Sequence, residues 1–371
     1  MTTTLLQTPL FSWHDAHGGS LVDFAGWSMP VKYTSIVDEH QATRLRVALF
    51  DVSHMGRLLV HGRDAVLFLE RMVTRRVKDM QPGRIRYSLV TDQSGGVLDD
   101  ILIYCVDSEG SDLAFQLVIN ASNREKIKSW LDLHVGKQQV SIVDLTFETS
   151  MIAVQGPRAL LTAQAIIDEP LESLGYYRSL VTNLDGTEAI VSRTGYTGED
   201  GIELIVAADK ALEVWECLLK AGQPHGVIPA GLAARDTLRL EAGMPLYGHE
   251  LDEQIDPIEA GLKFAVDLEE REFPGSQVLV ERSADGNSRK RIGLRLFGRR
   301  IPREGYSILD TSEIVGIVTS GTFSPTFECP IAMGFVPHEL AEPGTALSID
   351  IRGKLENAEV TALPFYKRSK T

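Results

Sequence analysis

The character of the sequence changes near residue 285, and this change most constrains the fold. The stretch ERSADGNSRKR, Glu281–Arg291, is polar with Gly, Asn and Ser, which is typical of a linker. Before it, segments with helical and strand periodicity alternate along the chain. After it come the short strand-like runs RIGLRL, EIVGIVTSG, CPIAMGFV, TALSIDIRG and AEVTALPF, separated by Gly, Pro and charged residues. The sequence therefore predicts a mixed α and β region followed by a small all-β barrel or roll over residues 285–371.

The mixed region contains several predicted elements. Helical spacing is expected over residues 35–47, 64–73, 122–133, 210–221 and 231–241. Strands are expected over residues 57–60, 85–91, 97–106, 113–120, 151–154, 189–193 and 202–207.

The length and charge of the chain limit its domain organisation and its partners. With 371 residues it exceeds what one hydrophobic core usually supports, so two or three domains are expected. A net charge of −14 argues against nucleic acid as a partner. The three cysteines are widely spaced, which is typical of a reducing compartment. No signal-peptide pattern and no long apolar run are seen, so the sequence predicts a cytoplasmic protein that does not enter a membrane.

The stretch GGVLDDILIYC, residues 95–105, places two adjacent carboxylates in an apolar strand. Because side chains alternate along a strand, Asp99 and Asp100 face opposite sides, and both sides are otherwise apolar. A carboxylate in apolar surroundings tends towards a raised pKa, which suits a general acid or base. The alternative, which the pattern alone favours slightly, is that one of them caps a turn or pairs with Arg84 or Arg86.

A second motif is RTGYTGEDGIE, residues 193–203, with three glycines that permit a tight loop. Tyr196 could stack on a flat ring, and Glu203 in the following strand could accept two hydrogen bonds from an aminopyrimidine edge. The alternative is a hairpin loop with solvated acids. The chain has neither a GxGxxG nor a GxxxxGK[ST] motif for nucleotide phosphates.

The third motif is GLAARDTLRLE, residues 231–241. On a helix Leu232, Arg235, Asp236 and Arg239 share one face, where a fixed guanidinium would suit a carboxylate ligand. An ion-pair ladder is the alternative interpretation, and the pattern alone favours it.

Histidines add little to the functional prediction. His14 and His17 have helical spacing but no supporting ligand cluster, so no metal site is predicted. His54 is interpreted as a hydrogen-bonded structural residue rather than a base.

The beginning of the C-terminal region is locally basic although the chain as a whole is acidic. This region would be either a solvated face or a docking site for an acidic protein. Seven basic residues lie within 15 positions: Arg289, Lys290, Arg291, Arg295, Arg299, Arg300 and Arg303.

Nine motifs, taken together and in order, resemble the aminomethyltransferases, the T-proteins of the glycine cleavage system. The resemblance runs from about Thr8 to Arg368, nearly the whole chain. The motifs are VDFAGWSMPVKY, EHQATRLRVALFDVSHMG, GGVLDD, RTGYTGEDGIEL, GLAARDTLRLEAGMPLYGHELDE, PIEAGL, PREGY, VGIVTSGTFSP and LPFYKR.

This resemblance implies an α+β fold, a three-domain cloverleaf of two discontinuous folate-binding α/β domains with antiparallel sheets plus a C-terminal all-β barrel or roll. The folate-binding region would span residues 1–280, as 1–50 with 145–245 and 51–144 with 246–280. The barrel would span residues 285–371.

The resemblance also implies an activity. Such an enzyme transfers the one-carbon unit of the aminomethyl group on the lipoylated H-protein to tetrahydrofolate, without a metal. The products are 5,10-methylenetetrahydrofolate, ammonia and dihydrolipoyl H-protein. Functional association with the P- and L-proteins of the glycine cleavage system is expected as well.

Site residues follow from the same motifs, position by position. The essential aspartate falls on Asp100, the second of GGVLDD. Contacts to the pterin and the rest of the folate fall on Tyr87, Asn120, Tyr196, Glu203 and Arg235. A further substrate contact falls on Tyr366 or Arg368 in FYKR, which the motif does not separate.

Two other functions share the expected fold. One is a folate-dependent demethylase or methyltransferase that acts on a small molecule, and the other is a non-catalytic folate-binding protein. A metal-dependent hydrolase using Asp99 and Asp100 is a third possibility from the residues alone.

Overall fold

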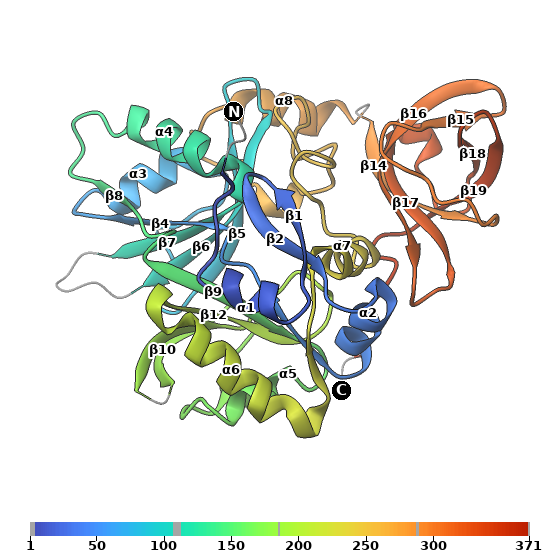
Figure 1. Cartoon of the computed structure of the whole chain (residues 1–371). Helices are drawn as coiled ribbons and strands as arrows, with labels where there is room; N and C mark the ends of the chain where they lie inside the picture. The colour runs from blue at the N-terminus through green and yellow to red at the C-terminus, as the bar shows by residue number, and fades with distance from the viewer. Residues whose placement is uncertain (1–3, 107–112, 185, 287–288, 370–371) are drawn as a thin grey trace. The chain divides into compact units, whose positions relative to one another are not determined.

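The computed structural model describes residues 4–106, 113–184, 186–286 and 289–369 (Figure 1). The α-helices are α1 (Phe11–Ala16), α2 (Ile36–Leu45), α3 (Ala65–Met72), α4 (Arg124–His134), α5 (Ala159–Gln164), α6 (Ala211–Gly222), α7 (Leu232–Glu241) and α8 (Ser276–Asp285). Short 3₁₀ turns lie at Ala121–Asn123, Leu171–Ser173, Ala208–Lys210, Gln223–His225, Lys263–Ala265 and His338–Leu340.

The described chain divides into two compact units, each made of several segments. The first comprises Met1–Leu69, Val77–Tyr87 and Ile101–Asp236, and the second comprises Glu70–Arg76, Ser88–Asp100 and Thr237–Thr371. The finer domain boundaries expected from the sequence stay a prediction.

A six-stranded sheet forms the centre of the first unit. Its strands, in spatial order, are β10 (Ser179–Leu184), β11 (Thr187–Ser192), β12 (Gly201–Ala207), β9 (Thr149–Gln155), β3 (Val47–Asp51) and β13 (Val227–Pro229). Neighbouring strands are antiparallel, except that β13 is parallel to β3. Helices α5 and α6 pack on β9, as Figure 1 shows. Trp215 and Leu218 of α6 are buried in one core with Val154 of β9, so the apolar helix face and the sheet exclude water together.

A five-stranded sheet carries the paired aspartates. Its order is β5 (Ile85–Thr91), β6 (Val97–Val106), β7 (Ala114–Ile119), β4 (Gly56–His61) and β8 (Ser141–Asp144). Strands β5 and β6 have the limits expected from the sequence. A separate two-stranded hairpin joins β1 (Ser20–Phe24) and β2 (Trp27–Lys32).

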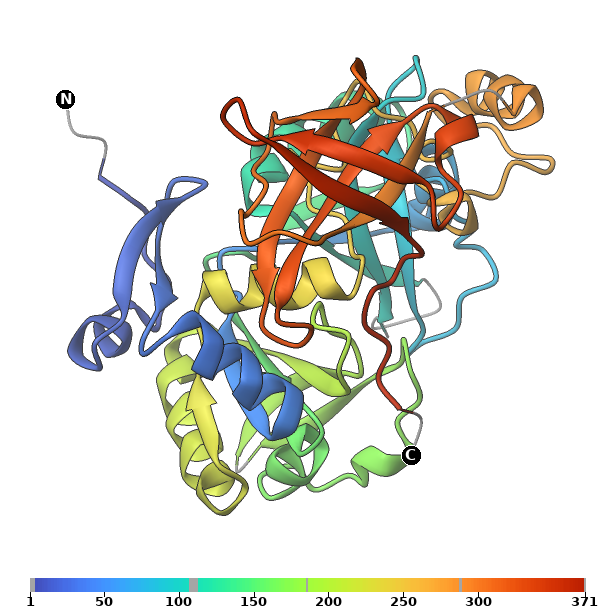
Figure 2. The same ribbon diagram turned by 90° about the vertical axis from the view of Figure 1, so that its right-hand side faces the viewer.

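The last six strands close into a barrel, which is the orange-to-red part of Figure 2. They are β14 (Lys290–Leu296), β17 (Cys329–Val336), β16 (Glu313–Ser324), β15 (Ser307–Asp310), β18 (Ala346–Asp350) and β19 (Leu355–Thr361), with β14 also paired to β19. Buried and exposed residues alternate along β19, and its buried Ala358 and Val360 join the barrel core. The predicted α+β fold, with mainly antiparallel sheets and a C-terminal β-barrel, is thus confirmed.

Two expectations about element boundaries are wrong. Residues 281–285 of the expected linker belong to α8, and β14 already begins at Lys290, so the connection lies around Gly286, whose φ is 69°. Helix α8 is polar over most of its length, and its composition therefore resembles that of a loop. The helix expected over 35–47 ends at Leu45, and Val47 begins the wholly buried strand β3, in which no polar alternation marks a strand.

Candidate functional site

Glu203 on β12 is a buried carboxylate at the centre of a polar cluster in the first unit. Glu203 is 5% exposed, and its Oε2 accepts a hydrogen bond from Thr194 Oγ1 at 2.5 Å. Burial raises the pKa of Glu203, although the Thr194 hydrogen bond and the charge of Arg235 act in the opposite direction. A carboxylate kept away from water in this way needs strong hydrogen-bond donors, and a ligand with N–H groups can supply them.

Arg235 and Tyr196 complete this cluster from two different elements. Arg235 lies in the first turn of α7, and its guanidinium carbon is 4.6 Å from the centre of the Tyr196 ring. Its Nη1 is buried and has no hydrogen-bond partner among the described residues. The third motif of the sequence thus provides a fixed guanidinium beside an aromatic ring. The ion-pair ladder does not account for Arg235.

Tyr104 on β6 joins the cluster, although it is not among the candidate residues of the sequence motifs. Its side chain is fully buried, and its hydroxyl lies 3.2 Å from Ser192 Oγ. Ser192 Oγ lies 2.9 Å from Thr194 Oγ1, which completes a hydrogen-bond chain to Glu203. Burial, together with the nearby Glu203 charge, raises the pKa of Tyr104, so its proton stays on the hydroxyl. The alternation of side chains along a strand could have indicated Tyr104, because Tyr104 and Asp100 lie on the same face of β6.

The paired aspartates differ in their surroundings. Asp99 is fully buried on a face of β6 whose residues are all buried, whereas Asp100 is only half-buried. The strand lies between β5, which carries Tyr87, and β7, which ends one residue before Asn120. Tyr87 and Asn120 are both half-buried.

The two C-terminal candidates lie after the last barrel strand. Tyr366 and Arg368 are both half-buried, and the Tyr366 amide donates to the carbonyl of Glu241 at 2.8 Å. The Glu241 carboxylate is itself fixed, since it accepts hydrogen bonds from Thr326 N and Oγ1 at 3.1 and 2.7 Å. The segment is therefore tied to the end of α7 within the second unit, but Tyr366 and Arg368 stay equivalent candidates.

His54 has an environment that differs from the expected one. It is 2% exposed, and its Nδ1 has no hydrogen-bond partner among the described residues, so its interpretation as a hydrogen-bonded histidine is wrong for this atom. Burial lowers the pKa of His54 to about 3. The Asp51 charge acts in the opposite direction, and the Arg235 and Arg57 charges add smaller effects that lower the pKa. The imidazole is therefore neutral and a poor base at neutral pH.

The two histidines of HDAH have structural partners. His14 Nε2 lies 2.9 Å from Asp51 Oδ2, and His14 Nδ1 lies 2.7 Å from the Tyr33 hydroxyl. His17 stacks on Trp13, with ring centres 4.0 Å apart. These contacts tie the N-terminal segment to β3, the strand that Asp51 ends.

We expect Asp51→Asn to lower the free energy of unfolding by roughly 2 kcal/mol at neutral pH. Burial alone would raise the pKa of Asp51, but hydrogen bonds from His14, Ser53 and Thr8 lower it to about 2. Because the folded pKa is below the unfolded value of 3.8, the stabilisation is complete above that pH and is lost as the pH falls towards 2. Denaturant unfolding of the wild type and of Asp51→Asn, from neutral pH down to about pH 2, measures the difference in their free energies of unfolding. A difference that does not change with pH would contradict the assignment.

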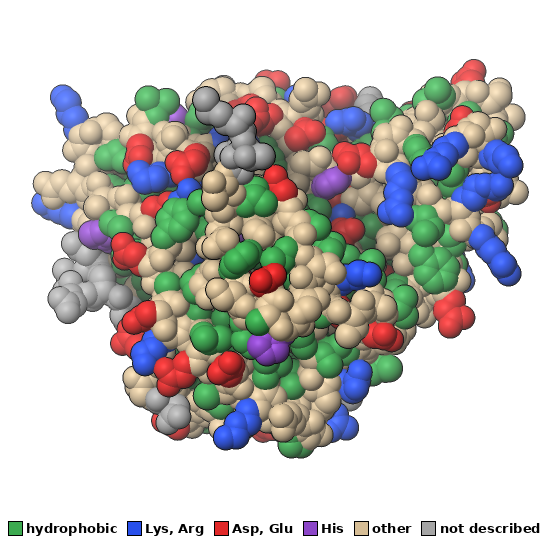
Figure 3. All heavy atoms as spheres, viewed as in Figure 1, with side chains coloured by type: hydrophobic (Ala, Val, Ile, Leu, Met, Phe, Trp, Pro, Cys, Tyr) green, Lys and Arg blue, Asp and Glu red, His purple; other side chains and the backbone are tan. Residues whose placement is uncertain are grey.

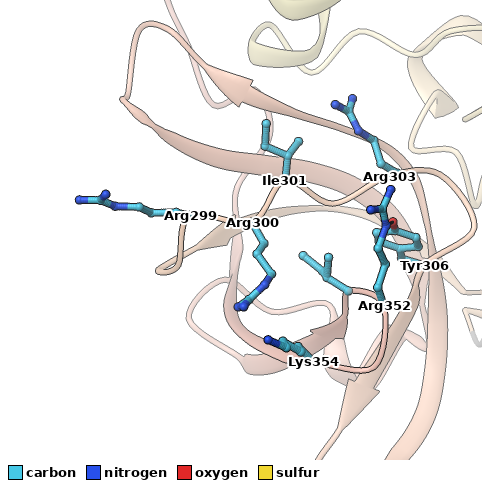
Figure 4. Close-up of a pocket in the computed structure, with 8 residues that line it drawn as sticks. Arg299, Arg300, Ile301, Arg303, Tyr306, Arg352 and Lys354 are labelled. Carbon is cyan, nitrogen blue, oxygen red and sulfur yellow. Dashed lines mark hydrogen bonds between the residues drawn. The ribbon is translucent and has the colours of Figure 1, made fainter.

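The barrel carries a separate, strongly basic pocket of about 530 Å³. Lys and Arg side chains gather over the barrel strands in Figure 3. Figure 4 shows Arg303 and Arg352 beside Tyr306, with Arg300 and Lys354 on the opposite side and Arg299 pointing outward. Arg300 forms an ion pair with Glu356, and Arg352 Nε donates to the Tyr306 hydroxyl at 3.3 Å.

The structure divides the basic cluster that the sequence showed as one run. Arg289 pairs with Glu259, and Arg291 donates to the carbonyls of Ala260 and Gly243, so these two have structural roles. Arg352 and Lys354, which the sequence analysis missed, reach the same pocket from about fifty residues further along. Only barrel closure places them there, and no local pattern could have indicated it.

Among the described residues, none of the helices has both the length and the apolar character that crossing a bilayer would require.

Comparisons with known proteins agree over almost the entire chain. The family model "GCVT N-terminal domain" matches residues 10–270, and "Glycine cleavage T-protein C-terminal barrel domain" matches residues 289–367. The aminomethyltransferase of Halothermothrix orenii is 44% identical over 97% of this chain and 99% of its own length. That of Geobacillus kaustophilus is 44% identical over 99% of this chain and its full length.

A solved structure gives the same result for the fold. The glycine cleavage system aminomethyltransferase T from Bartonella henselae superposes with a TM-score of 0.91 at 34% identity, and the match covers 98% of each chain. Full-length sequence similarity and full-length structural similarity therefore point to one family. The chain belongs to the aminomethyltransferases, the T-proteins of the glycine cleavage system.

Proposed function

We propose that the chain transfers the one-carbon unit of the aminomethyl group on lipoylated H-protein to tetrahydrofolate. The products are 5,10-methylenetetrahydrofolate, ammonia and dihydrolipoyl H-protein. The observation that carries this proposal is the buried Glu203 carboxylate, hydrogen-bonded by Thr194 and close to the Arg235–Tyr196 pair. Membership of the aminomethyltransferase family supports the same reaction.

The cluster around Glu203 suits the pterin ring of tetrahydrofolate. Its aminopyrimidine edge presents N–H donors, and a carboxylate can accept two of them with charge-assisted hydrogen bonds. The Tyr196 ring, held by Arg235, offers an aromatic surface for a flat ligand. We assign Tyr87, Asn120 and either Tyr366 or Arg368 to further contacts with the substrate.

We assign the catalytic role to Asp100. A folate nitrogen attacks the aminomethyl carbon as ammonia leaves, and a second folate nitrogen then bonds to the same carbon as the carbon–sulfur bond breaks. The two protons that the nitrogens lose pass to the departing ammonia and to the sulfur, which returns the lipoyl thiol. The reaction needs no oxidant, because the carbon keeps its oxidation level and only changes its bonding partners. A carboxylate beside the attacking nitrogen orients it and accepts its proton, which is typically worth roughly 10²–10⁴ in rate.

The barrel pocket is our proposed docking surface for H-protein. Its five cationic side chains stand out in a chain whose net charge is −14, so they attract an acidic surface selectively. The splayed arrangement in Figure 4 suits several carboxylates spread over a protein surface better than one small ligand.

Reversing two of these charges should weaken docking without changing the chemistry. For the double variant Arg299→Glu, Arg303→Glu we expect the KM for aminomethyl-loaded H-protein to rise about tenfold at low salt, with kcat preserved. Arg295→Glu is the matched control, because Arg295 is exposed on the same barrel but does not line the pocket. An equal rise in KM per reversed charge in the double variant and in Arg295→Glu would contradict a specific docking surface. An unchanged KM in the double variant would show that the pocket does not bind H-protein.

The test of the proposed function is formation of methylenetetrahydrofolate from aminomethyl-loaded H-protein and tetrahydrofolate, with and without the chain. Transfer from a small-molecule donor but not from H-protein would favour a demethylase or methyltransferase. Tight tetrahydrofolate binding with no transfer from either donor would favour a non-catalytic folate-binding protein.

We also propose that the protein works in the cytoplasm, in functional association with the P- and L-proteins. All three cysteines lie in the described ranges and none forms a disulfide, which suits a reducing compartment.

A further inference from the structure

The loop that carries Thr194 and Tyr196 is held by one buried side-chain amide, that of Gln155 at the end of β9. Gln155 is fully buried. Its Nε2 donates to the carbonyls of Thr194 at 3.1 Å and Ile202 at 3.3 Å, and its Oε1 accepts from Thr197 Oγ1 at 2.8 Å. One carboxamide thus connects the two ends of the loop, Thr194 and Ile202, to Thr197 in its middle.

The loop glycines fit closely around this amide. A Cβ at Gly195 would lie 2.1 Å from Gln155 Oε1, and a Cβ at Gly201 would lie 2.5 Å from Gln155 Nε2. Such distances are too short for any real contact. A side chain at residue 195 would displace the amide from its hydrogen bonds, whereas one at residue 201 would also clash with the Val154 carbonyl oxygen at 2.4 Å. At residue 195 glycine is therefore required for close packing against Gln155.

A second clamp holds the far side of the loop. Arg44 Nη1 of α2 donates to the Thr197 carbonyl at 2.7 Å and to Glu199 Oε1 at 3.0 Å. The Arg44 and Glu199 side chains are 4% and 5% exposed, so water competes little for this ion pair. Arg44 thus holds residues 197–199, and Gln155 holds the backbone of Thr194 at the start of the loop.

We propose that Gln155 is a positioning residue for the tetrahydrofolate site, acting through Thr194 and Tyr196. Thr194 donates to Glu203, and Tyr196 lies against Arg235, so a shift of residues 194–196 changes both contacts at once. This inference rests on the proposed function, since it takes the cluster around Glu203 as the pterin site. A loop ordered before binding spares the ligand the cost of ordering it.

The substitution Gln155→Ala should raise the Kd for tetrahydrofolate about tenfold or more, because the ligand must then order the loop. Gly195→Ala should do the same, since its methyl group expels the amide. In the double variant the methyl occupies the space that Gln155 has left, so the Kd should be no higher than that of Gln155→Ala alone. Gly175→Ala is the control, because a Cβ there makes only an ordinary 3.5 Å contact.

Tetrahydrofolate titration, with kcat, KM and thermal midpoint measured on the same preparations, decides the question. If the folded variants have a lower thermal midpoint but an unchanged Kd for tetrahydrofolate, Gln155 has only a structural role and the proposal is overturned. Independent, multiplying effects of the two substitutions would overturn it as well. Should Gln155→Ala fail to fold, Thr197→Val removes one of the three hydrogen bonds at nearly constant volume, and it must then raise the Kd.

Glu203→Ala separates this inference from the function on which it rests. If that variant binds tetrahydrofolate as the wild type does, the pterin site itself is wrongly assigned. If Glu203→Ala loses affinity while Gln155→Ala keeps it, only the positioning role fails.

Discussion

Asp100→Asn is expected to bind tetrahydrofolate and to fold normally while losing roughly 10²–10⁴ in turnover. The amide has nearly the same shape as the carboxylate, and residue 100 is only half-buried on β6, so packing changes little. It cannot accept a proton from the attacking folate nitrogen, and it offers that nitrogen no negative charge. Single-turnover formation of methylenetetrahydrofolate from loaded H-protein measures the loss directly.

The adjacent residue provides the control. Asp99 is fully buried on the other face of the same strand, so Asp99→Asn changes a buried carboxyl group and its contacts rather than the proposed catalytic group. We expect a lower thermal midpoint for Asp99→Asn, with turnover per folded molecule close to wild type. A reversed pattern, in which Asp99→Asn abolishes turnover and Asp100→Asn does not, would exchange the roles of the two residues.

Glu203 substitutions should produce the second large effect, on affinity rather than turnover. Two charge-assisted hydrogen bonds to the pterin edge are worth roughly 1.5–3 kcal/mol each, so Glu203→Ala should weaken tetrahydrofolate binding by about 10²-fold or more. Glu203→Gln should also bind weakly, since one donor of its amide would face donors of the ligand. If both variants bind tetrahydrofolate with unchanged affinity, Glu203 does not contact the pterin.

The ionisation of Glu203 should also affect the thermal midpoint and the pH dependence of tetrahydrofolate binding. Burial raises the pKa of Glu203, so the ionised carboxylate destabilises the unliganded protein at neutral pH. Glu203→Gln should therefore leave the thermal midpoint unchanged or raise it. The ligand binds the ionised form, so wild-type affinity should fall as the pH decreases through the raised pKa. Glu203→Gln should lose this pH dependence, which a titration series at several pH values can follow.

The sequence determined those features that depend on local pattern. Alternation in β6 separated Asp99 from Asp100, and the limits of β5 and β6 followed from β-rich residues on either side of a glycine turn. The short strands after residue 285 indicated a barrel because Gly, Pro and charged residues separate them. Ordered motifs along nearly the whole chain indicated the family.

Features that depend on burial without alternation were missed. Strand β3 is buried at all five positions, and its one polar residue, Asp51, stands at its end, so no alternation of polar and apolar residues marks its period. Helix α8 is polar enough to resemble a linker, although Leu279 is fully buried. A local pattern shows which residues are polar, but not whether the rest of the chain covers them.

Only the tertiary structure decided which side chains meet in the site. Tyr104, Glu203 and Arg235 come from β6, β12 and α7, and their shared cluster exists because the first unit brings these elements together. Arg352 and Lys354 join Arg299 through barrel closure, and Gln155 meets Gly195 across forty residues. The sequence by itself determined the strands that carry the site, most of the candidate residues and the family. The contacts that give those residues their pKa values and their positions depend on long-range packing, which no local spacing encodes.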